Sequence, residues 1–223
     1  MRVTDVPDTT LLVVLLGLLP FVLLATTSFA KLTIVLGLLR NAFGPSDVPP
    51  SSVVVVLAAL LTGYVMLPVA RAVVEASAVD MARVDAKAPF AGASGEALRA
   101  AFDHGKEPVR AFLDRNAGAA ERGTFLQLYR ARVPEAQQAE VSEHDFAVVL
   151  PAFFITEIKE ALQLGFLLLL PFFVLDLALA AMLTALGMQS LPPTSVALPF
   201  KLLLFVSIDG ARTLAETLIT GYR

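Results

Sequence analysis

The chain has 223 residues, 57% of them hydrophobic, and a mean hydropathy of +0.74, so it is far more apolar than a soluble domain at about 45–50%. The formal net charge is −3, and residues 71–146 hold ten of the 17 Lys and Arg and twelve of the 20 Asp and Glu. These nearly balanced charges argue against nucleic acid or an anionic membrane surface as partner, and the absence of cysteine excludes disulfides and thiolate metal sites.

The first predicted element is an uncharged run at residues 11–30, long enough to cross a membrane. Residues 28–30 resemble a signal-peptide cleavage site, but the segment before the run is not positively charged, so we reject a secretory signal. Lys31 and Arg40 follow the run. By the positive-inside rule, the first loop is expected in the cytoplasm and both termini and the middle segment outside.

A turn at residues 44–53 leads into a second uncharged run at 53–70, which contains Pro68. The turn aligns without a gap on residues 187–196, with five of ten positions identical. Each copy places Gly after a helix, then two prolines, then a hydroxyl residue expected to be the N-cap of the next helix. Convergent turn chemistry and a duplicated hairpin both explain this repeat.

The middle segment, residues 75–141, is expected to form short helices, the first capped by Ser94. Residues 142–145 have capping-box spacing, so the third long helix is expected to begin near 142. Pro151 would lie inside that helix and Pro171 near its junction with a fourth. Interior prolines kink helices, and the predicted kink positions are Pro68, Pro151, Pro171 and Pro199.

Residues 151–210 are mostly apolar yet carry six charges. A charge facing lipid costs roughly 2.5–3.5 kcal/mol, so six would cost about 15–20 kcal/mol. Glu157 and Glu160 share one helix face, whereas Lys159 lies about 160° away from Glu157 and cannot neutralise it within the helix. We therefore predict a charged interface between subunits, formed by Lys31, Glu157, Lys159, Glu160, Asp176, Lys201 and Asp209. Ion pairs within one chain and a proton or ion pathway remain the alternatives.

Three runs carry a family resemblance: TSFAKLTIVLGLLRNAFG (27–44), PAFFITEIKEALQLGF (151–166) and PTSVALPFKLLLFVSIDG (193–210). They closely resemble the export-apparatus family of type III secretion and flagellar systems known as SctR, YscR, HrcR or FliP. The resemblance covers nearly the whole chain outside residues 75–140. Only ten residues precede the first apolar run, which favours the injectisome branch over flagellar members with a cleavable signal peptide.

The resemblance implies an all-α fold: a hydrophobic hairpin (1–74), a polar helical insertion on the periplasmic side (75–141) and a second hairpin (142–223). It implies a non-enzymatic core subunit of the export gate at the bacterial inner membrane. About five copies would wind into a helical ring with SctS/FliQ-type and SctT/FliR-type subunits, largely on the periplasmic side. SctU/FlhB-type and SctV/FlhA-type proteins and unfolded secreted substrates are the further implied partners, and no cofactor is implied.

The loop at 187–193 is the candidate gate, because the family often places methionines there as a deformable seal around the closed pore. The predicted gate residues are Gly187, Met188, Gln189 and Leu191. This chain keeps only one methionine in the loop, so Leu191 or a partner protein would supply the rest of the closure. A plain exposed turn is the alternative.

Two other functions compete with this interpretation. A small ion-coupled transporter would use Glu157, Glu160 or Asp176 as its carrier site. Ser28 and Lys31 have the spacing of a hydrolase dyad, but no accompanying catalytic motif is present. His104 and His144 are expected to be surface residues, being forty residues apart with no metal-ligand company.

Overall fold

The computed structural model of the chain describes residues 8–44, 48–85, 92–188 and 190–222, which are helical and contain no strand. This confirms the all-α prediction. The helices are α1 (Asp8–Thr26), α2 (Phe29–Phe43), α3 (Ser51–Met81), α4 (Gly92–Asn116), α5 (Ala119–Arg130), α6 (Glu135–Gln138), α7 (Phe146–Ala185), α8 (Pro193–Ser207) and α9 (Gly210–Thr220).

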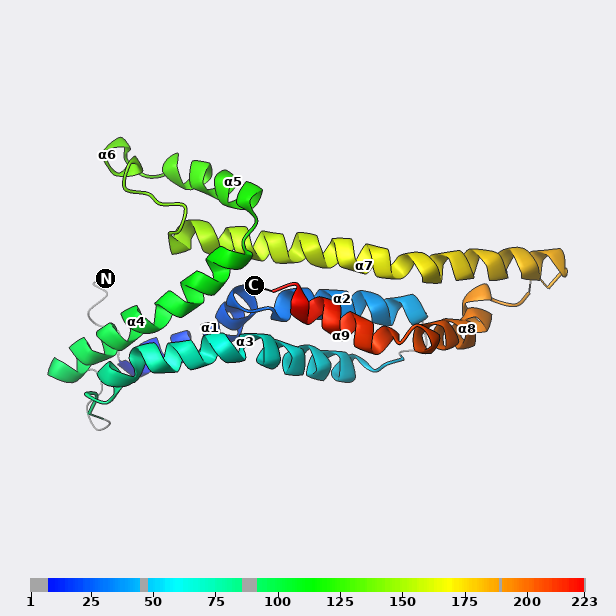
Figure 1. Cartoon of the computed structure of the whole chain (residues 1–223), viewed down its shortest axis with the longest axis horizontal. Helices are drawn as coiled ribbons and strands as arrows, with labels where there is room; N and C mark the ends of the chain where they lie inside the picture. Colours follow the sequence, from blue (N-terminus) through cyan, green and yellow to red (C-terminus); the bar gives the residue numbers. More distant parts are fainter. Residues whose placement is uncertain (1–7, 45–47, 86–91, 189, 223) are drawn as a thin grey trace.

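The molecule is an elongated bundle, and helices α5 and α6 project from its side (Figure 1). Helix α7 runs along the bundle, and α2, α3 and α9 lie roughly parallel to it, with α8 at the far end. Helix α4 crosses from α3 towards α7, and α5 packs on α7, so the polar insertion is attached to both hairpins. The N-terminal helix α1 turns away from α2 by 78°.

Helices α3 and α7 are long and apolar enough to cross a membrane. The bent pairs α1–α2 and α8–α9 would bring the number of candidate spans among the described residues to four, if each pair counts as one. The number equals that of the apolar helices expected from the sequence, but their bounds differ, because α7 covers the uncharged run at 161–175 and the start of the run at 177–200 that were expected as separate helices. Helix α3 of the first hairpin continues to Met81, so its last two turns lie in the range expected for the insertion, 75–141.

The second hairpin differs from the prediction in where its helices end. Helix α7 begins at Phe146 rather than near 142, and the carboxylate of Asp145 accepts a hydrogen bond from the Ser142 amide at 2.9 Å. It is one 40-residue helix, so Pro171 lies in its interior and not at a junction. Pro68, Pro151 and Pro199 also lie inside helices, and the measured sharp bends are the 78° turn before Phe29 and the 61° turn before Gly210.

The two similar turns have the expected glycine chemistry but not the expected N-caps. Gly44 and Gly187 have φ of 109° and 72°, values that favour glycine after a helix. The residues at the N-cap positions are Pro50 and Pro192, and neither helix has a side-chain cap hydrogen bond. Proline suits this place because the first amides of a helix have no partner within it.

The first helix of the insertion is longer than the short helices expected. Helix α4 runs unbroken for 25 residues, from Gly92 to Asn116, through Pro108. The Ser94 hydroxyl accepts a hydrogen bond from the Asp85 amide at 3.0 Å, so it ties α4 to the end of the preceding segment instead of capping the helix.

The buried side chains form three apolar clusters along the bundle. The first joins α3, α4 and α7 around Phe112 and Phe153, and the second joins α2, α3, α7 and α9 around Leu32 and Leu218. The third, around Phe43, lies against α7 and α8. Each cluster joins the two hairpins, so neither hairpin is buried without the other.

The joint between α8 and α9 generates the first prediction. A Cβ at Gly210 would lie 2.4 Å from the Phe205 ring and 2.9 Å from its carbonyl oxygen. Gly210→Ala is therefore expected to lower the stability of the purified protein by about 1–3 kcal/mol, since the backbone oxygen cannot move aside. Thermal unfolding in detergent measures this change.

Gly63→Ala is the matched control, because nothing lies within 4 Å of a Cβ at that position inside α3. It is expected to raise helix stability by about 0.5–1 kcal/mol. Equal unfolding temperatures for the two variants would contradict the close packing described at Gly210.

Candidate charged interface and gate loop

The most buried charges meet where α2 crosses α7. Lys31 and Glu157 are 2% and 1% exposed, and the Lys31 ammonium lies 3.2 Å from Glu157 Oε1. It also lies 2.5 Å from Glu160 Oε2. The two carboxylates share one face of α7 because they are three residues apart. We call Lys31, Glu157, Glu160 and Tyr222 the first charged cluster.

Tyr222 completes this cluster from the C-terminal end of the chain. Its hydroxyl donates a hydrogen bond to Glu157 Oε2, and the Lys31 ammonium lies 4.4 Å from its ring centroid. The ring also stacks on Phe112 of α4 at 6.0 Å. One ammonium thus faces two carboxylates, and the second of these, Glu160, is 45% exposed and can be hydrated.

A second cluster lies near the far end of the bundle. The Lys201 ammonium is 3% exposed, lies 2.8 Å from Asp176 Oδ2 and donates to the Ala42 carbonyl at 2.7 Å. That carbonyl belongs to the last turn of α2, where carbonyls lack helical partners and the helix dipole favours a cation. Lys201 therefore joins α8 to both α7 and α2.

The remaining predicted charges lie at the surface. Lys159 is 55% exposed and pairs with Glu121 of α5 at 2.9 Å, and this hydrogen bond lowers the pKa of the Glu121 carboxyl. Such exposed pairs contribute little, about 0–1 kcal/mol. Asp209 is exposed, has a left-handed backbone (φ 50°), and forms no ion pair with any residue that the structure describes.

Six of the seven predicted interface residues are therefore paired inside one chain. The free-energy cost of placing these charged side chains in a membrane does not by itself require a second copy of the chain, because each has a partner on another helix. Pairing between subunits stays a prediction. It applies best to Glu160, whose side chain is 45% exposed, and to Asp209, which is exposed; Asp176 is 33% exposed and its Oδ1 is buried without a hydrogen-bond partner in the described chain.

The gate loop lies at the tip of the hairpin between α7 and α8 (Figure 1). Met188 and Leu191 are 43% and 41% exposed, so both apolar side chains are available for contact. Gly187 adopts a left-handed backbone, and Gln189 lies outside the described residues. The loop's position at an end of the molecule allows several copies to bring their tips together.

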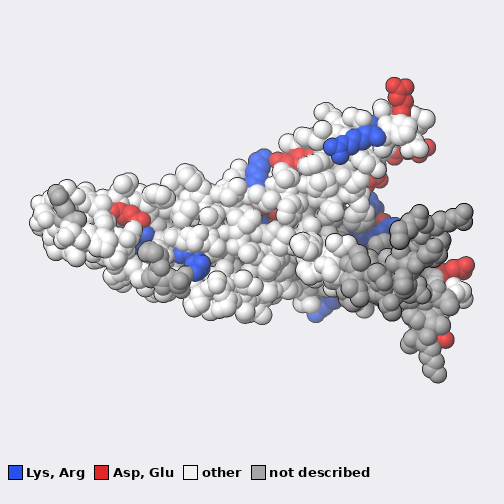
Figure 2. Space-filling model, turned by 180° about the vertical axis from the view of Figure 1, so that it is seen from behind, with Lys and Arg blue, Asp and Glu red and all other residues white. Residues whose placement is uncertain are grey.

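Large apolar side chains cover the outer faces of the bundle. The second half of α7 exposes Phe166, Phe173 and Leu177 at 62–69%. Figure 2 shows the same feature on one face, where charged side chains are sparse over the α7–α8 end and more frequent towards the insertion. Surfaces of this size and character are normally covered by lipid or by other protein.

The Ser28–Lys31 pair and the two histidines, considered above as alternative sites, make ordinary structural contacts. The Lys31 ammonium contacts two carboxylates, so it is not held as a free base for Ser28. His104 and His144 are 62% and 47% exposed, as expected, and their rings lie against Asp80 and Asp114 at 2.7 and 2.9 Å. Within the described ranges, no group of three or more His, Cys, Asp or Glu could hold a metal ion.

Sequence reasoning missed Tyr222 and Glu121. Tyr222 follows α9 at a position where no periodicity singles it out, and its role depends on α2, α4 and α7 converging there. Glu121 is one of twelve acids between residues 71 and 146, and only the packing of α5 on α7 distinguishes it from the others.

Comparison with known proteins gives a consistent result. The FliP family model matches residues 12–218. The chain is 39% identical to the hypersensitivity response secretion protein HrcR of Ralstonia nicotianae, over 94% of both chains. It is 36% identical to the Yop proteins translocation protein R of Yersinia pestis (93% of this chain, 92% of the relative). It is 39% identical to the flagellar biosynthetic protein FliP of Pectobacterium carotovorum (96% and 78%).

The first charged cluster generates a stability prediction. Lys31→Met removes the ammonium and leaves Glu157 buried beside Glu160 without a cation. Loss of one partner of a buried pair typically costs about 3–5 kcal/mol. Thermal unfolding in detergent is expected to show a loss of this size, with much of it recovered when Glu157→Gln is added.

Lys159→Met is the matched control, since Lys159 also pairs with a carboxylate of another helix but is 55% exposed. Its effect is expected to stay within about 1 kcal/mol. If both lysine variants lose the same stability, the buried pair is not what joins α2 to α7.

Proposed function

Because the chain belongs to the FliP family, we propose that it is a core subunit of a type III protein export channel in the bacterial inner membrane. Its copies would form part of the opening through which unfolded secreted proteins pass. The single observation that carries this proposal is the family match across both hairpins and the insertion, residues 12–218. The names of the relatives, which refer to secretion, translocation and flagellar biosynthesis, agree with it.

We assign the chain to the injectisome branch. The HrcR and Yop relatives, whose names refer to secretion and translocation, are 39% and 36% identical to the chain and support this assignment. The unfolded substrates are then proteins delivered outside the cell.

Assembly into a ring follows from the exposed apolar faces. Helices α3, α7 and α8 leave large apolar side chains uncovered along the bundle, and copies of the chain would cover one another there. About five copies with SctS/FliQ-type and SctT/FliR-type subunits would form the ring, largely on the periplasmic side of the membrane. SctU/FlhB-type and SctV/FlhA-type proteins would meet it at its edges.

The charged interface and the gate have separate tasks in this proposal. The half-exposed carboxylate of Glu160 would accept a cation from a neighbouring copy, while its partner Lys31 and the partner of Asp176, Lys201, join the second hairpin to α2. The tips bearing Met188 and Leu191 would converge and close the pore. Methionine suits a closure that must open for varied polypeptides, because its side chain is unbranched and adaptable.

Native mass spectrometry of the detergent-extracted protein, co-expressed with its partner subunits, tests the proposal. An export-channel subunit is expected in one large complex with several copies. A small ion-coupled transporter, the competing function, would be stable and active alone as a monomer or dimer. A monomer that transports ions without partners would refute the channel assignment.

The gate loop gives a prediction of its own. Met188→Ala is expected to let small ions leak through the closed complex, because it removes the loop's methionine side chain from the closure. Conductance of the reconstituted complex measures this leak. Met81→Ala, at the end of α3 and 49% exposed, is the matched control and is expected to leave conductance unchanged. Equal conductance of the two variants would remove the gate assignment.

A further inference from the structure

The corner between α8 and α9 projects an unpaired acid beside apolar side chains. The bend there is 61°, Val206 and Ile208 are 75% and 53% exposed, and Asp209 follows at the left-handed position. The acids of α7, α8 and α9 each have a cationic partner: Glu157, Glu160, Asp176 and Glu216. Asp209, between α8 and α9, forms no ion pair within the described chain.

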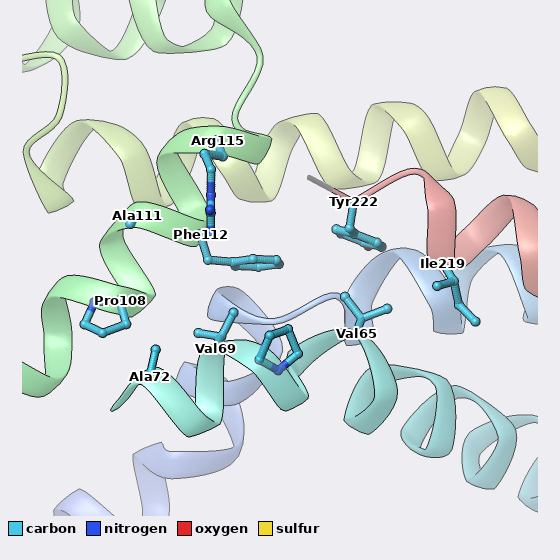
Figure 3. A pocket seen from close by; sticks show the side chains of 10 residues that line it. Val65, Val69, Ala72, Pro108, Ala111, Phe112, Arg115, Ile219 and Tyr222 are labelled. Carbon is cyan, nitrogen blue, oxygen red and sulfur yellow. The ribbon is translucent and has the colours of Figure 1, made fainter. Parts of the chain in front are cut away.

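A pocket of about 540 Å³ lies between α3, α4 and the C-terminal end of the chain (Figure 3). Its walls are mostly apolar, with Val65 and Val69 from α3, Phe112 from α4 and Ile219 from α9. Arg115 is the one charged residue that lines it. Arg115 is exposed, and no residue described by the structure forms an ion pair or hydrogen bond with it.

The acid and the arginine of one chain cannot meet each other. Asp209 precedes the first residue of α9, whereas Ile219 and Tyr222 at the other end of α9 line the pocket. An eleven-residue helix is about 16 Å long. The corner and the pocket are therefore two separate, complementary surfaces of the same molecule.

We propose that the corner of one copy docks into the pocket of the next copy. Ile208 enters the apolar part of the pocket, and the Asp209 carboxylate pairs with the Arg115 guanidinium, which presents a fork suited to a carboxylate. This inference rests on the proposed function, in which several copies assemble. It deepens that function by naming the contact that joins them.

The geometry of this contact matches a winding assembly. Two different surfaces on each copy make a heterologous contact, which repeats from copy to copy and gives a ring or an open helix. Because the two surfaces lie about one α9 length apart along the bundle, each copy is displaced along its neighbour. A displacement of this kind produces a rising helix instead of a flat ring.

Arg115 is a better partner for Asp209 than Arg99, the other exposed arginine of α4 that lines a pocket. Arg99 lines an apolar groove of about 1000 Å³ together with Asp103 and Lys106. An incoming carboxylate would have to compete there with Asp103, which already pairs with Lys106. The pocket of Arg115 has no acidic lining residue.

A charge swap tests the contact in the co-expressed complex. Arg115→Glu or Asp209→Lys alone is expected to lower the fraction of chain in the large complex about tenfold or more, because each places like charges together. The double variant is expected to restore it. Arg99→Glu is the matched control and is expected to assemble as the wild type does. Asp209→Asn removes the carboxylate charge while keeping a residue that tolerates the left-handed backbone at this position.

The absence of cysteine allows a direct geometric test. Copies with Ile208→Cys and copies with Ala111→Cys, which lines the pocket, carry different tags and are co-expressed with the partner subunits. Oxidation is expected to join the two tagged chains by a disulfide. Ala120→Cys, at an exposed position of α5, replaces Ala111→Cys in the control and is expected to give no cross-link.

Three outcomes would overturn the inference while the proposed function stands, provided that the wild type still forms the large complex. These are no cross-link at Ala111, an Arg115→Glu variant that assembles as well as Arg99→Glu, and a double charge swap that fails to restore assembly. Absence of any large complex from the wild-type chain would overturn both proposals.

Discussion

The fold depends on a constraint of electrostatics: an ammonium or carboxylate removed from water must find an opposite charge or a strong hydrogen bond. Lys31 and Lys201 are each nearly inaccessible; Lys31 satisfies it with a carboxylate 126 positions away, and Lys201 with Asp176 on the preceding helix and with the distant Ala42 carbonyl. Both lysines contact α2 or belong to it, and both have carboxylate partners on α7. The two hairpins are therefore joined by charge as well as by the apolar clusters, and the apolar clusters alone would not fix which helix faces which.

With these charges paired inside one chain, the case for assembly rests on surfaces instead. The outer faces of α3, α7 and α8 are apolar, while the insertion carries most of the balanced charge. These apolar faces need to be covered by lipid or by other protein. Lipid can cover them before assembly and neighbouring copies afterwards, which agrees with the proposed ring of copies.

The sequence was sufficient for the helical class and the presence of long apolar helices, because these follow from hydropathy. The sequence did not predict the helix bounds and side-chain partners that depend on tertiary contacts. Pro171 does not end a helix, since 40 residues of α7 are supported along their length by α2, α4, α5 and α8. The sequence predicted that Glu157 pairs with a cation on another helix. It did not predict the contact with Tyr222, which depends on the way four separate segments meet in the fold.

The separation of Lys31 from its carboxylate has a consequence for biogenesis. The two residues lie 126 positions apart, so at roughly 5–20 residues per second the ribosome needs about 6–25 s to make the second after the first. During this interval the nascent first hairpin carries the unpaired ammonium of Lys31 among apolar side chains. The insertion machinery must therefore shelter a half-made chain until α7 emerges, and a pause in translation within the polar insertion would prolong that vulnerable stage.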